Sequence, residues 1–388
     1  MSGEAARATA LLERLIDVAD DGGRLRETLA GTPLAVTAPL LIDELVFRAD
    51  DPTNSEPVRI AVDVVDGDER ESFVLTLRAG RPIDVARGAP SGEPGMLVEY
   101  TATQLVRTLF GLPTGAANAG RRTVPLYGQP REATTVPEPG MVDQVHRAAN
   151  ALFGGTDPER GSLEEYAVRY GADKWGGLHW FTPHYERHFR RFRDRPVRVL
   201  EIGIGGFQDP DEGGQSLKLW KRYFRRGIVH GMDVYPKNGL DAPRIRTITA
   251  DQSDVDTLVA LAERDGPYDI VIDDGSHQNE HVLITFAALF PYVRPGGFYV
   301  IEDLWTTYVP GYGGTEGGEG GPGTSVGLLK RLIDELHHEE WTGKAEAEPG
   351  GPASSLAGMY VYHNIAFLEK GVNLEGGIPE WIRSWPLS

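Results

Sequence analysis

The spacing of hydrophobic positions changes near the middle of the chain. In residues 1–140, some segments repeat apolar residues at helical spacing and others alternate apolar with polar residues, which predicts an α+β unit. The expected helices are Ala5–Val18, Ala38–Phe47 and Thr101–Phe110, and the expected strands are Pro57–Val65, Glu71–Leu77 and Met96–Tyr100. The turn Asp66-Gly67-Asp68-Glu69 between the first two strands is typical of a hairpin. Residues 111–140 are rich in Pro, Gly and Thr, which predicts a linker or an ordered arm.

In the second half, short apolar runs alternate with helical patterns, which predicts a mostly parallel α/β sheet. The expected strands are Val197–Ile202, Val229–Val234, Arg246–Ala250, Tyr268–Ile272 and Phe298–Ile301, and the helices are Ser216–Phe224, Val255–Glu263 and Glu280–Leu289. Gly358–Tyr362 and Ile365–Glu369 flank His363-Asn364, which predicts an antiparallel hairpin. Such a hairpin closing a parallel sheet is typical of the Rossmann-like fold of S-adenosylmethionine (SAM)-dependent methyltransferases.

These patterns predict three regions. We expect an auxiliary α+β domain over residues 1–140, a linker and helical lead-in over 141–195, and a SAM-dependent methyltransferase domain over 196–388. Residues 311–323 contain so many glycines that we expect them to form a mobile loop rather than to pack.

Composition narrows the classes of partner and compartment. The chain has 388 residues, with 39 basic and 57 acidic side chains and a formal charge of −18, which disfavours a nucleic-acid partner. It has no cysteine, which excludes disulfides, zinc–thiolate sites and thiol nucleophiles. The first twenty residues do not read as a signal peptide, and no apolar stretch approaches the roughly 20 residues of a membrane span. We therefore expect a cytoplasmic protein without a membrane partner.

Acidic and glycine residues follow the predicted strands, where open α/β sheets bind ligands. After the first strand come Gly203 and Gly205, which let a cofactor approach the backbone, and Glu201 and Ser216 flank this loop. Asp233 ends the second strand and suits two ribose hydroxyls. The other candidate cofactor residues follow the third and fourth strands, namely Asp251 and Gln252 for an adenine amino group and Asp273 facing the cofactor.

NAD is the competing cofactor. Its Gly-x-Gly-x-x-Gly motif lacks the last glycine here, because Gln208 occupies that position. The loop continues to Ser216 before a helix begins, so no helix N-terminus adjoins the glycines to hold a pyrophosphate. SAM has no pyrophosphate and carries a positive sulfonium, which suits an acidic loop. The pattern favours SAM.

Carboxylates gather at the ends of two neighbouring strands. Asp273-Asp274 ends one strand and Glu302-Asp303 ends the next, and adjacent strands lie about 5 Å apart. Like charges this close favour a hard divalent cation, and all-oxygen ligands indicate Mg²⁺. We predict Asp274, Glu302 and Asp303 as its ligands, although any one of them could instead cap a helix.

A histidine lies three residues after the predicted ligand Asp274. An imidazole can take a proton from a hydroxyl during methyl transfer, so His277 is the candidate general base. Coordination to Mg²⁺ would lower the pKa of that hydroxyl. We assign His281 a structural role. Lys174 either pairs with the methionine carboxylate of SAM or lies in solvent, and residues 179–185 either form an aromatic core segment or cover SAM.

These motifs resemble the actinomycete O-methyltransferases that modify deoxysugars on macrolides and related antibiotics. The resemblance is strongest from Leu178 to Gly376. It is carried by His179–Tyr185, Leu200–Gly206, Asp269–His277, Val293–Asp303 and Tyr362-His363-Asn364, with weaker segments at Gly95–Tyr100 and Leu109-Phe110-Gly111. The N-terminal domain and the loop 311–323 diverge from the family pattern.

The resemblance implies a function and an assembly. It implies SAM as methyl donor, Mg²⁺ held by Asp274, Glu302 and Asp303, and His277 as base. It also implies a small-molecule glycosylated natural product as acceptor, and a homotetramer whose N-terminal domain covers a neighbour's active site. A catechol or other phenol is the alternative acceptor. A metal-binding or scaffolding protein without catalysis and an NAD-dependent dehydrogenase remain as other classes.

Overall fold

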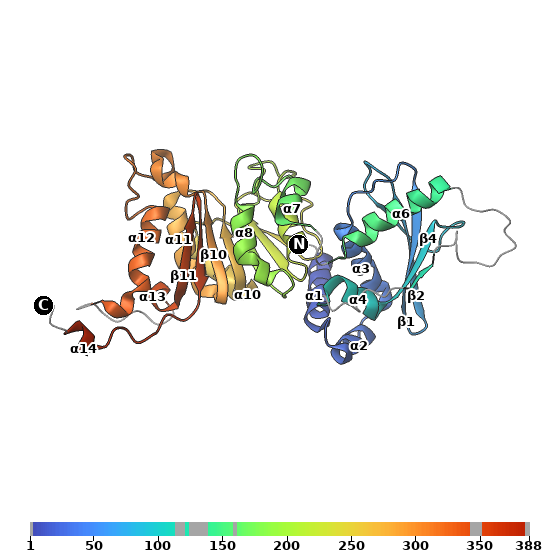
Figure 1. The fold of residues 1–388 in the computed structure, drawn as a ribbon, viewed down its shortest axis with the longest axis horizontal. Coiled ribbons are helices and arrows are strands. Elements are labelled where there is room, and N and C mark those ends of the chain that lie inside the picture. Colours follow the sequence, from blue (N-terminus) through green and yellow to red (C-terminus); the bar gives the residue numbers. More distant parts are fainter. Residues whose placement is uncertain (1–2, 113–120, 124–138, 158–160, 342–350, 385–388) are drawn as a thin grey trace. The chain divides into compact units, whose positions relative to one another are not determined.

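The computed structural model describes residues 3–112, 121–123, 139–157, 161–341 and 351–384 (Figure 1). The chain forms two compact units, one made of Met1–Ser162 with Arg222–Arg226 and the other of Leu163–Lys221 with Gly227–Ser388. The first boundary therefore lies at residue 162, and the predicted linker 141–195 is divided between the units. Its helix α6 (Pro139–Gly154) packs against elements of the first unit and buries Ala148 and Leu152 there.

The first unit is the α+β unit that the patterns predict. Its sheet has the order β3-β2-β1-β4-β5. The strands are β1 (Val58–Asp66), β2 (Glu69–Leu77), β3 (Asp84–Arg87), β4 (Met96–Thr101) and β5 (Arg121–Thr123), and the helices before α6 are α1 (Gly3–Val18), α2 (Gly22–Ala30), α3 (Leu34–Arg48) and α4 (Ala102–Phe110). The hairpin β1–β2 closes at Asp66 opposite Glu69, and Thr101 caps α4.

Three elements of the first unit were not predicted, and one of them is the short strand β5 within the predicted linker or arm. Strand β3 is exposed at every position, so it lacks the apolar alternation that marks a half-buried strand. Helix α2 is a short segment with two buried leucines, Leu25 and Leu29. Of the predicted linker or arm 111–140, residues 113–120 and 124–138 lie outside the described residues.

The second unit is built on a seven-stranded sheet of order β11-β12-β10-β9-β6-β7-β8. Its strands are β6 (Arg198–Ile202), β7 (Ile228–Asp233), β8 (Ile245–Thr249), β9 (Tyr268–Asp273), β10 (Val293–Glu302), β11 (Leu356–Tyr362) and β12 (Ile365–Lys370). Strands β8, β7, β6, β9 and β10 are parallel, and β12 is antiparallel to both β10 and β11. The predicted parallel sheet with a closing antiparallel hairpin is confirmed.

Helices cover the sheet of the second unit (Figure 1). They are α7 (Leu163–Tyr170), α8 (Thr182–Phe189), α9 (Gln215–Tyr223), α10 (Val255–Asp265), α11 (Asn279–Leu289), α12 (Ser325–Leu336), α13 (Pro352–Ser355) and α14 (Glu380–Arg383). Apolar side chains of α10, α11 and α12 pack with those of the strands into one core, which includes Leu258, Phe286 and Leu332. Burial of this core supplies the main favourable free energy of folding and fixes the strand ends. Among the described residues, no helix is both long and apolar enough to cross a membrane.

The glycine-rich segment 311–323 makes specific packing contacts, contrary to our expectation that it would not pack. It begins within the 3-10 turn η4 (Pro310–Tyr312), after η3 (Leu304–Tyr308), and ends just before α12. The backbone N–H of Thr315 donates to the carbonyl of Thr307 at 2.8 Å. A Cβ on Gly314 would lie 2.4 Å from the carbonyl oxygen of Thr306, so a glycine permits this close approach.

Candidate active site

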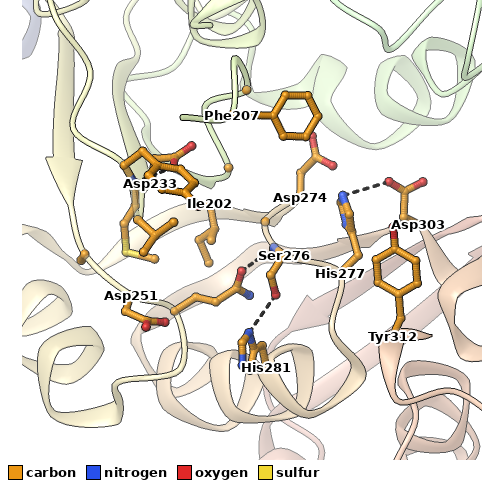
Figure 2. Close-up of a pocket in the computed structure, with 18 of the residues that line it drawn as sticks. Ile202, Phe207, Asp233, Asp251, Asp274, Ser276, His277, His281, Asp303 and Tyr312 are labelled. Carbon is orange, nitrogen blue, oxygen red and sulfur yellow. Dashed lines mark hydrogen bonds and ion pairs between the residues drawn. The ribbon is translucent and has the colours of Figure 1, made fainter. Parts of the chain in front are cut away.

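A cavity of about 610 Å³ opens at the carboxyl ends of the parallel strands of the second unit (Figure 2). Its walls come from the ends of β6, β7, β8, β9 and β10, with further residues from the segments before β6 and after η3. The strand order reverses between β6 and its two neighbours, β9 and β7, which is where open α/β sheets bind ligands. The volume lies in the range of small-molecule and cofactor sites.

Two of the predicted glycines shape the floor of the cavity. Gly203 has φ +93° and Gly205 has φ +78°, conformations that favour glycine. A Cβ on Gly203 would lie 2.0 Å from the carbonyl oxygen of Asp274, so this glycine lets the β6 and β9 loops meet. At Gly205 a Cβ would find no atom closer than 4.0 Å, so packing leaves room there and the backbone conformation sets the requirement.

Asp233 and Asp251 stand on the cavity wall with their carboxylates anchored by backbone groups (Figure 2). The Asp233 carboxylate accepts from the N–H of Ile204 at 3.0 Å and from that of Tyr235 at 2.9 Å. One oxygen of Asp251 accepts from the N–H and the hydroxyl of Ser253, and these bonds lower the pKa of Asp251. Each Asp233 oxygen can accept a second hydrogen bond, and the other Asp251 oxygen takes no part in the bonds to Ser253. Both side chains can therefore still bind hydroxyl or amino groups of a ligand.

Gln252 lines the cavity, whereas Asp273 lies beneath it. The Gln252 amide accepts from the N–H of Ser276 at 2.6 Å and donates to Asp273 at 3.2 Å. Asp273 also accepts from the hydroxyl of Tyr299 at 3.1 Å. Burial raises the pKa of Asp273 to about 7. Asp273 is therefore turned toward Gln252 and Tyr299, and its bonds position the cavity wall.

Glu201 and Ser216 bind each other inside the protein and do not line the cavity. The hydroxyl of Ser216 donates to Glu201 at 2.7 Å, and the indole N–H of Trp220 donates to its other oxygen at 3.1 Å. Burial raises the pKa of Glu201 to about 7, although the positive charge of Lys174 acts in the opposite direction. This pair joins β6 to α9 and supports the glycine loop from behind.

Asp274, His277 and Asp303 converge at one side of the cavity (Figure 2). One ligand atom from each lies within 4.8 Å of the others, and His277 Nε2 lies 3.4 Å from Asp303 Oδ2. His277 has φ +56° and Asp303 has φ +55°, a region that residues other than glycine enter at a cost of order 1–3 kcal/mol. The surrounding hydrogen bonds offset this strain. Asp303, for example, accepts from Trp305 and Asn364.

Glu302, the third predicted metal ligand, lies next to this group, and its carboxylate is bound by Tyr185 and Lys174. The hydroxyl of Tyr185 donates to one of its oxygens, and Lys174 Nζ lies 2.9 Å from the other. Lys174 also donates to Asp274. Burial, followed by the charge of Asp274, raises the pKa of Glu302 well above its usual range.

The sequence left two roles open for Lys174, pairing with the methionine carboxylate of SAM or lying in solvent. In the structure Lys174 is buried and does not line the cavity, so it takes neither position. Its side chain is 1% exposed and its nitrogen faces four carboxylates, because Glu201 and Asp173 lie within 4.0 Å in addition to Asp274 and Glu302. Burial opposes the charged form, but the attraction of these carboxylates outweighs it and raises the pKa of Lys174 well above its usual value. The chain therefore holds a cation inside its acidic cluster, and no local signal in the sequence identified it.

The segment 179–185 serves the core and the site at once. Phe181 and Tyr185 are buried, and Trp180 is exposed. His179 lines the cavity, with its Nε2 3.5 Å from Asp303. The cavity also includes Phe207, Tyr235 and Tyr312, which sequence reasoning did not single out. These three follow strands or lie in loops, where only the fold determines which side chains face a site.

The donor set fits a hard divalent cation beside an organic ligand. A carboxylate oxygen of Asp274 and one of Asp303 lie within 4.8 Å of each other, and Glu302 shares Lys174 with Asp274. Mg²⁺ prefers such oxygen ligands. The cavity wall supplies two anchored carboxylates and an amide around a glycine loop, which fits a nucleoside. The arrangement can hold a cation, a nucleoside and a hydroxyl-bearing substrate near one imidazole.

Comparisons with known proteins agree with this geometry. Residues 12–121 match the family model of the MycE methyltransferase N-terminal region. Demethylmacrocin O-methyltransferase of Streptomyces fradiae is 47% identical over 90% of this chain and 88% of its own. Mycinamicin VI 2''-O-methyltransferase of Micromonospora griseorubida is 45% identical over 92% of this chain and 90% of its own.

A solved structure has the same fold over almost the whole chain. The MycE methyltransferase from the mycinamycin biosynthetic pathway, in complex with Mg, SAH and mycinamycin VI, has a TM-score of 0.87 and 43% sequence identity. The match covers 98% of this chain and 97% of that one. Sequence identity and fold thus extend through both units. The chain therefore belongs to the family of antibiotic-pathway O-methyltransferases that includes these proteins, and it is an O-methyltransferase.

Proposed function

We propose that this enzyme transfers a methyl group from SAM to a deoxysugar hydroxyl of a glycosylated polyketide, with Mg²⁺ bound and His277 as the general base. The observation that carries the proposal is the convergence of Asp274, His277 and Asp303 beside an anchored nucleoside-type wall in one cavity. The MycE complex with Mg, SAH and a macrolide supports it, because SAH is what remains of SAM after methyl transfer.

The cofactor side of the cavity would bind SAM through residues on three strand ends. Asp233 would accept hydrogen bonds from the ribose hydroxyls, since each of its oxygens keeps an accepting position. Asp251 would serve the adenine side, while the amide of Gln252 holds Ser276 in place. Gly203 and Gly205 would let the cofactor lie against the backbone. Glu201, Ser216 and Asp273 would act indirectly by supporting this wall.

The metal side would use Asp274 and Asp303, with Glu302 as third carboxylate. A bound Mg²⁺ supplies a Lewis acid that lowers the pKa of a coordinated hydroxyl and orients its oxygen. Both oxygens of Glu302 already accept one hydrogen bond, so Glu302 would join through a remaining lone pair while Tyr185 and Lys174 hold the carboxylate. Asp303 is fixed by Trp305 and Asn364, so it offers a preorganised ligand.

His277 would take the proton of the acceptor hydroxyl through its imidazole. The side chain lies at the cavity surface, 25% exposed, and its Nε2 lies 3.4 Å from Asp303 Oδ2. A carboxylate at that distance stabilises the imidazolium that forms when the proton arrives. His277 also lies close enough to Asp274 and Asp303 to be a metal ligand, but Mg²⁺ prefers oxygen, which favours the role of base.

We expect full dependence on a divalent cation and on a sugar acceptor. Purified enzyme is assayed for conversion of SAM to SAH with glycosylated polyketides, with the matching aglycones and with simple catechols, each with and without EDTA. Turnover of glycosides that EDTA abolishes and added Mg²⁺ restores is the expected result, because metal coordination supplies the acidity that a sugar hydroxyl lacks. Full activity in EDTA would contradict the metal, and methylation of catechols but not of glycosides would contradict the sugar acceptor.

We propose further that the enzyme is a homotetramer in which the N-terminal unit mediates assembly and covers a neighbour's active site. The separate family model for residues 12–121 and the compact sheet of that unit support a dedicated role for it. Sedimentation velocity of the full chain should give about four times the 42.4 kDa protomer mass. A monomer at micromolar concentration would contradict the assembly.

A further inference from the structure

Lys174 reaches the acidic cluster from a loop that is closed by backbone pairing. The loop follows α7, and the carbonyl of Lys174 accepts from the N–H of Phe181 at 2.9 Å. Trp175 and Trp180 pair as an isolated β-bridge, and their rings meet edge to face with centroids 4.7 Å apart. The lysine side chain is 1% exposed, so the fold directs its nitrogen to one place.

The partners of Lys174 are those expected of a bound metal ion. Its nitrogen donates to Asp274 and lies 2.9 Å from Glu302, two of the three carboxylates that we predict as Mg²⁺ ligands. Another buried lysine of the same unit, Lys370, shows the contrast. Lys370 donates to the backbone carbonyls of Phe290 and Pro291 at 2.9 and 3.0 Å. Lys174 is thus distinguished from Lys370 by its carboxylate partners.

Asp274 and Glu302 depend on Lys174 to different degrees. Glu302 has a second anchor in the hydroxyl of Tyr185 and no exposed side-chain surface. Asp274 lines the cavity with 18% of its side chain exposed, and it belongs to the group with His277 and Asp303. Asp274 therefore contacts the buried ammonium group of Lys174 and also borders the cavity, where Mg²⁺ would bind.

We propose that Lys174 is the resident cation of the metal site, which holds Asp274 and Glu302 in place in the metal-free enzyme and competes with Mg²⁺ for them. The inference rests on the proposed function. A positive charge this close to two ligand carboxylates weakens the binding of a second cation, and the loss of that charge strengthens it. In the metal-free state the same charge offsets the repulsion between the carboxylates of Asp274 and Glu302. Lys174 is thus a positioning residue that sets metal affinity.

The test is calorimetric titration of MgCl₂ into metal-stripped, full-length enzyme. Wild type is compared with Lys174→Met and Lys174→Gln, the latter keeping a hydrogen-bond donor without charge. We expect both variants to bind Mg²⁺ about tenfold or more tightly than wild type. Their melting temperatures should fall without metal and recover more than that of wild type when Mg²⁺ is added, since binding to the folded state stabilises it.

Two control variants separate charge from other effects. Lys370→Met removes a buried lysine that donates hydrogen bonds to backbone carbonyls, and its Mg²⁺ affinity should match wild type. Tyr185→Phe removes the other bond to Glu302 without changing net charge, and we expect less than about a threefold change in affinity. A similar gain in Lys370→Met would overturn the proposal, because the effect would then belong to any buried lysine.

The remaining outcomes are equally decisive. Unchanged or weaker Mg²⁺ binding by folded Lys174 variants overturns this inference and leaves the proposed function intact. Absence of Mg²⁺ binding by wild type overturns both. If neither variant folds, crystal structures of wild type with and without MgCl₂ decide the matter. Release of Asp274 by Lys174 in the metal-bound crystal supports the proposal, and an unchanged contact beside a bound metal overturns it.

Discussion

His277→Asn should lower kcat by about 10²–10⁴-fold while Mg²⁺ and SAM still bind, as expected when a general base is lost. Asparagine is the suitable replacement, because His277 has φ +56° and asparagine tolerates this left-handed conformation better than alanine does. Its amide cannot hold the proton of the acceptor hydroxyl. Steady-state kinetics at saturating SAM, acceptor and Mg²⁺ gives kcat, and calorimetry gives the two affinities.

The same variant separates the two roles open to this imidazole. If His277 is the base, the loss falls on kcat. If it is a metal ligand, the loss falls on Mg²⁺ affinity, and excess Mg²⁺ restores part of the rate. His281→Ala is the control, because that histidine also lines the cavity and binds Ser276 at 2.8 Å. Its effect should appear in the KM for SAM rather than in kcat. Unchanged turnover by His277→Asn would exclude the assigned role.

Asp274→Asn should weaken Mg²⁺ binding by about 100-fold or more and abolish activity at millimolar Mg²⁺. Loss of one partner of a buried charge pair costs about 2–5 kcal/mol, and each 1.4 kcal/mol is a factor of ten in affinity. Asparagine keeps the shape and one oxygen, so the change isolates the charge. Titration of MgCl₂ into the stripped variant, followed by melting with and without metal, measures the effect.

The melting temperature distinguishes a metal defect from a folding defect. Asp274 also binds Lys174, and Glu302 remains as a partner for that lysine, so the variant should fold. Asp256→Asn serves as the matched control, because Asp256 lies exposed on α10 of the same unit. We expect wild-type binding there. If Asp274→Asn retained wild-type Mg²⁺ affinity, the carboxylate assignment would have to be abandoned.

The pattern of apolar positions predicted much of the fold because it reflects burial directly. Strands β6, β7 and β9 and the second half of β10 are buried on both faces almost throughout and appear as mostly apolar runs. The exposed edge strand β3 gave no such signal. The boundary at residue 162 could not be read from composition either, because the packing of α6 within the first unit decides it.

Within the site, the sequence by itself determined which residues stand at strand ends. Asp233, Asp251, Asp274, His277 and Asp303 all reach the cavity, since parallel strands bring their carboxyl ends to one edge of the sheet. Only the tertiary structure decided where the neighbouring side chains turn. Asp273 and Glu302 are the last residues of β9 and β10 and bind buried partners, whereas Asp274 and Asp303 follow the strands and line the cavity.

Lys174 is the clearest case of what the fold alone decides. It lies 100 residues from Asp274 and 128 from Glu302 along the chain, and nothing in its local sequence indicates a buried charge. A lone lysine is usually solvated, and burial is tolerated here because carboxylates from two strands surround the ammonium group. The local sequence pattern predicts which residues end the strands. Which charged side chains pair at those ends depends on packing between residues far apart in the sequence.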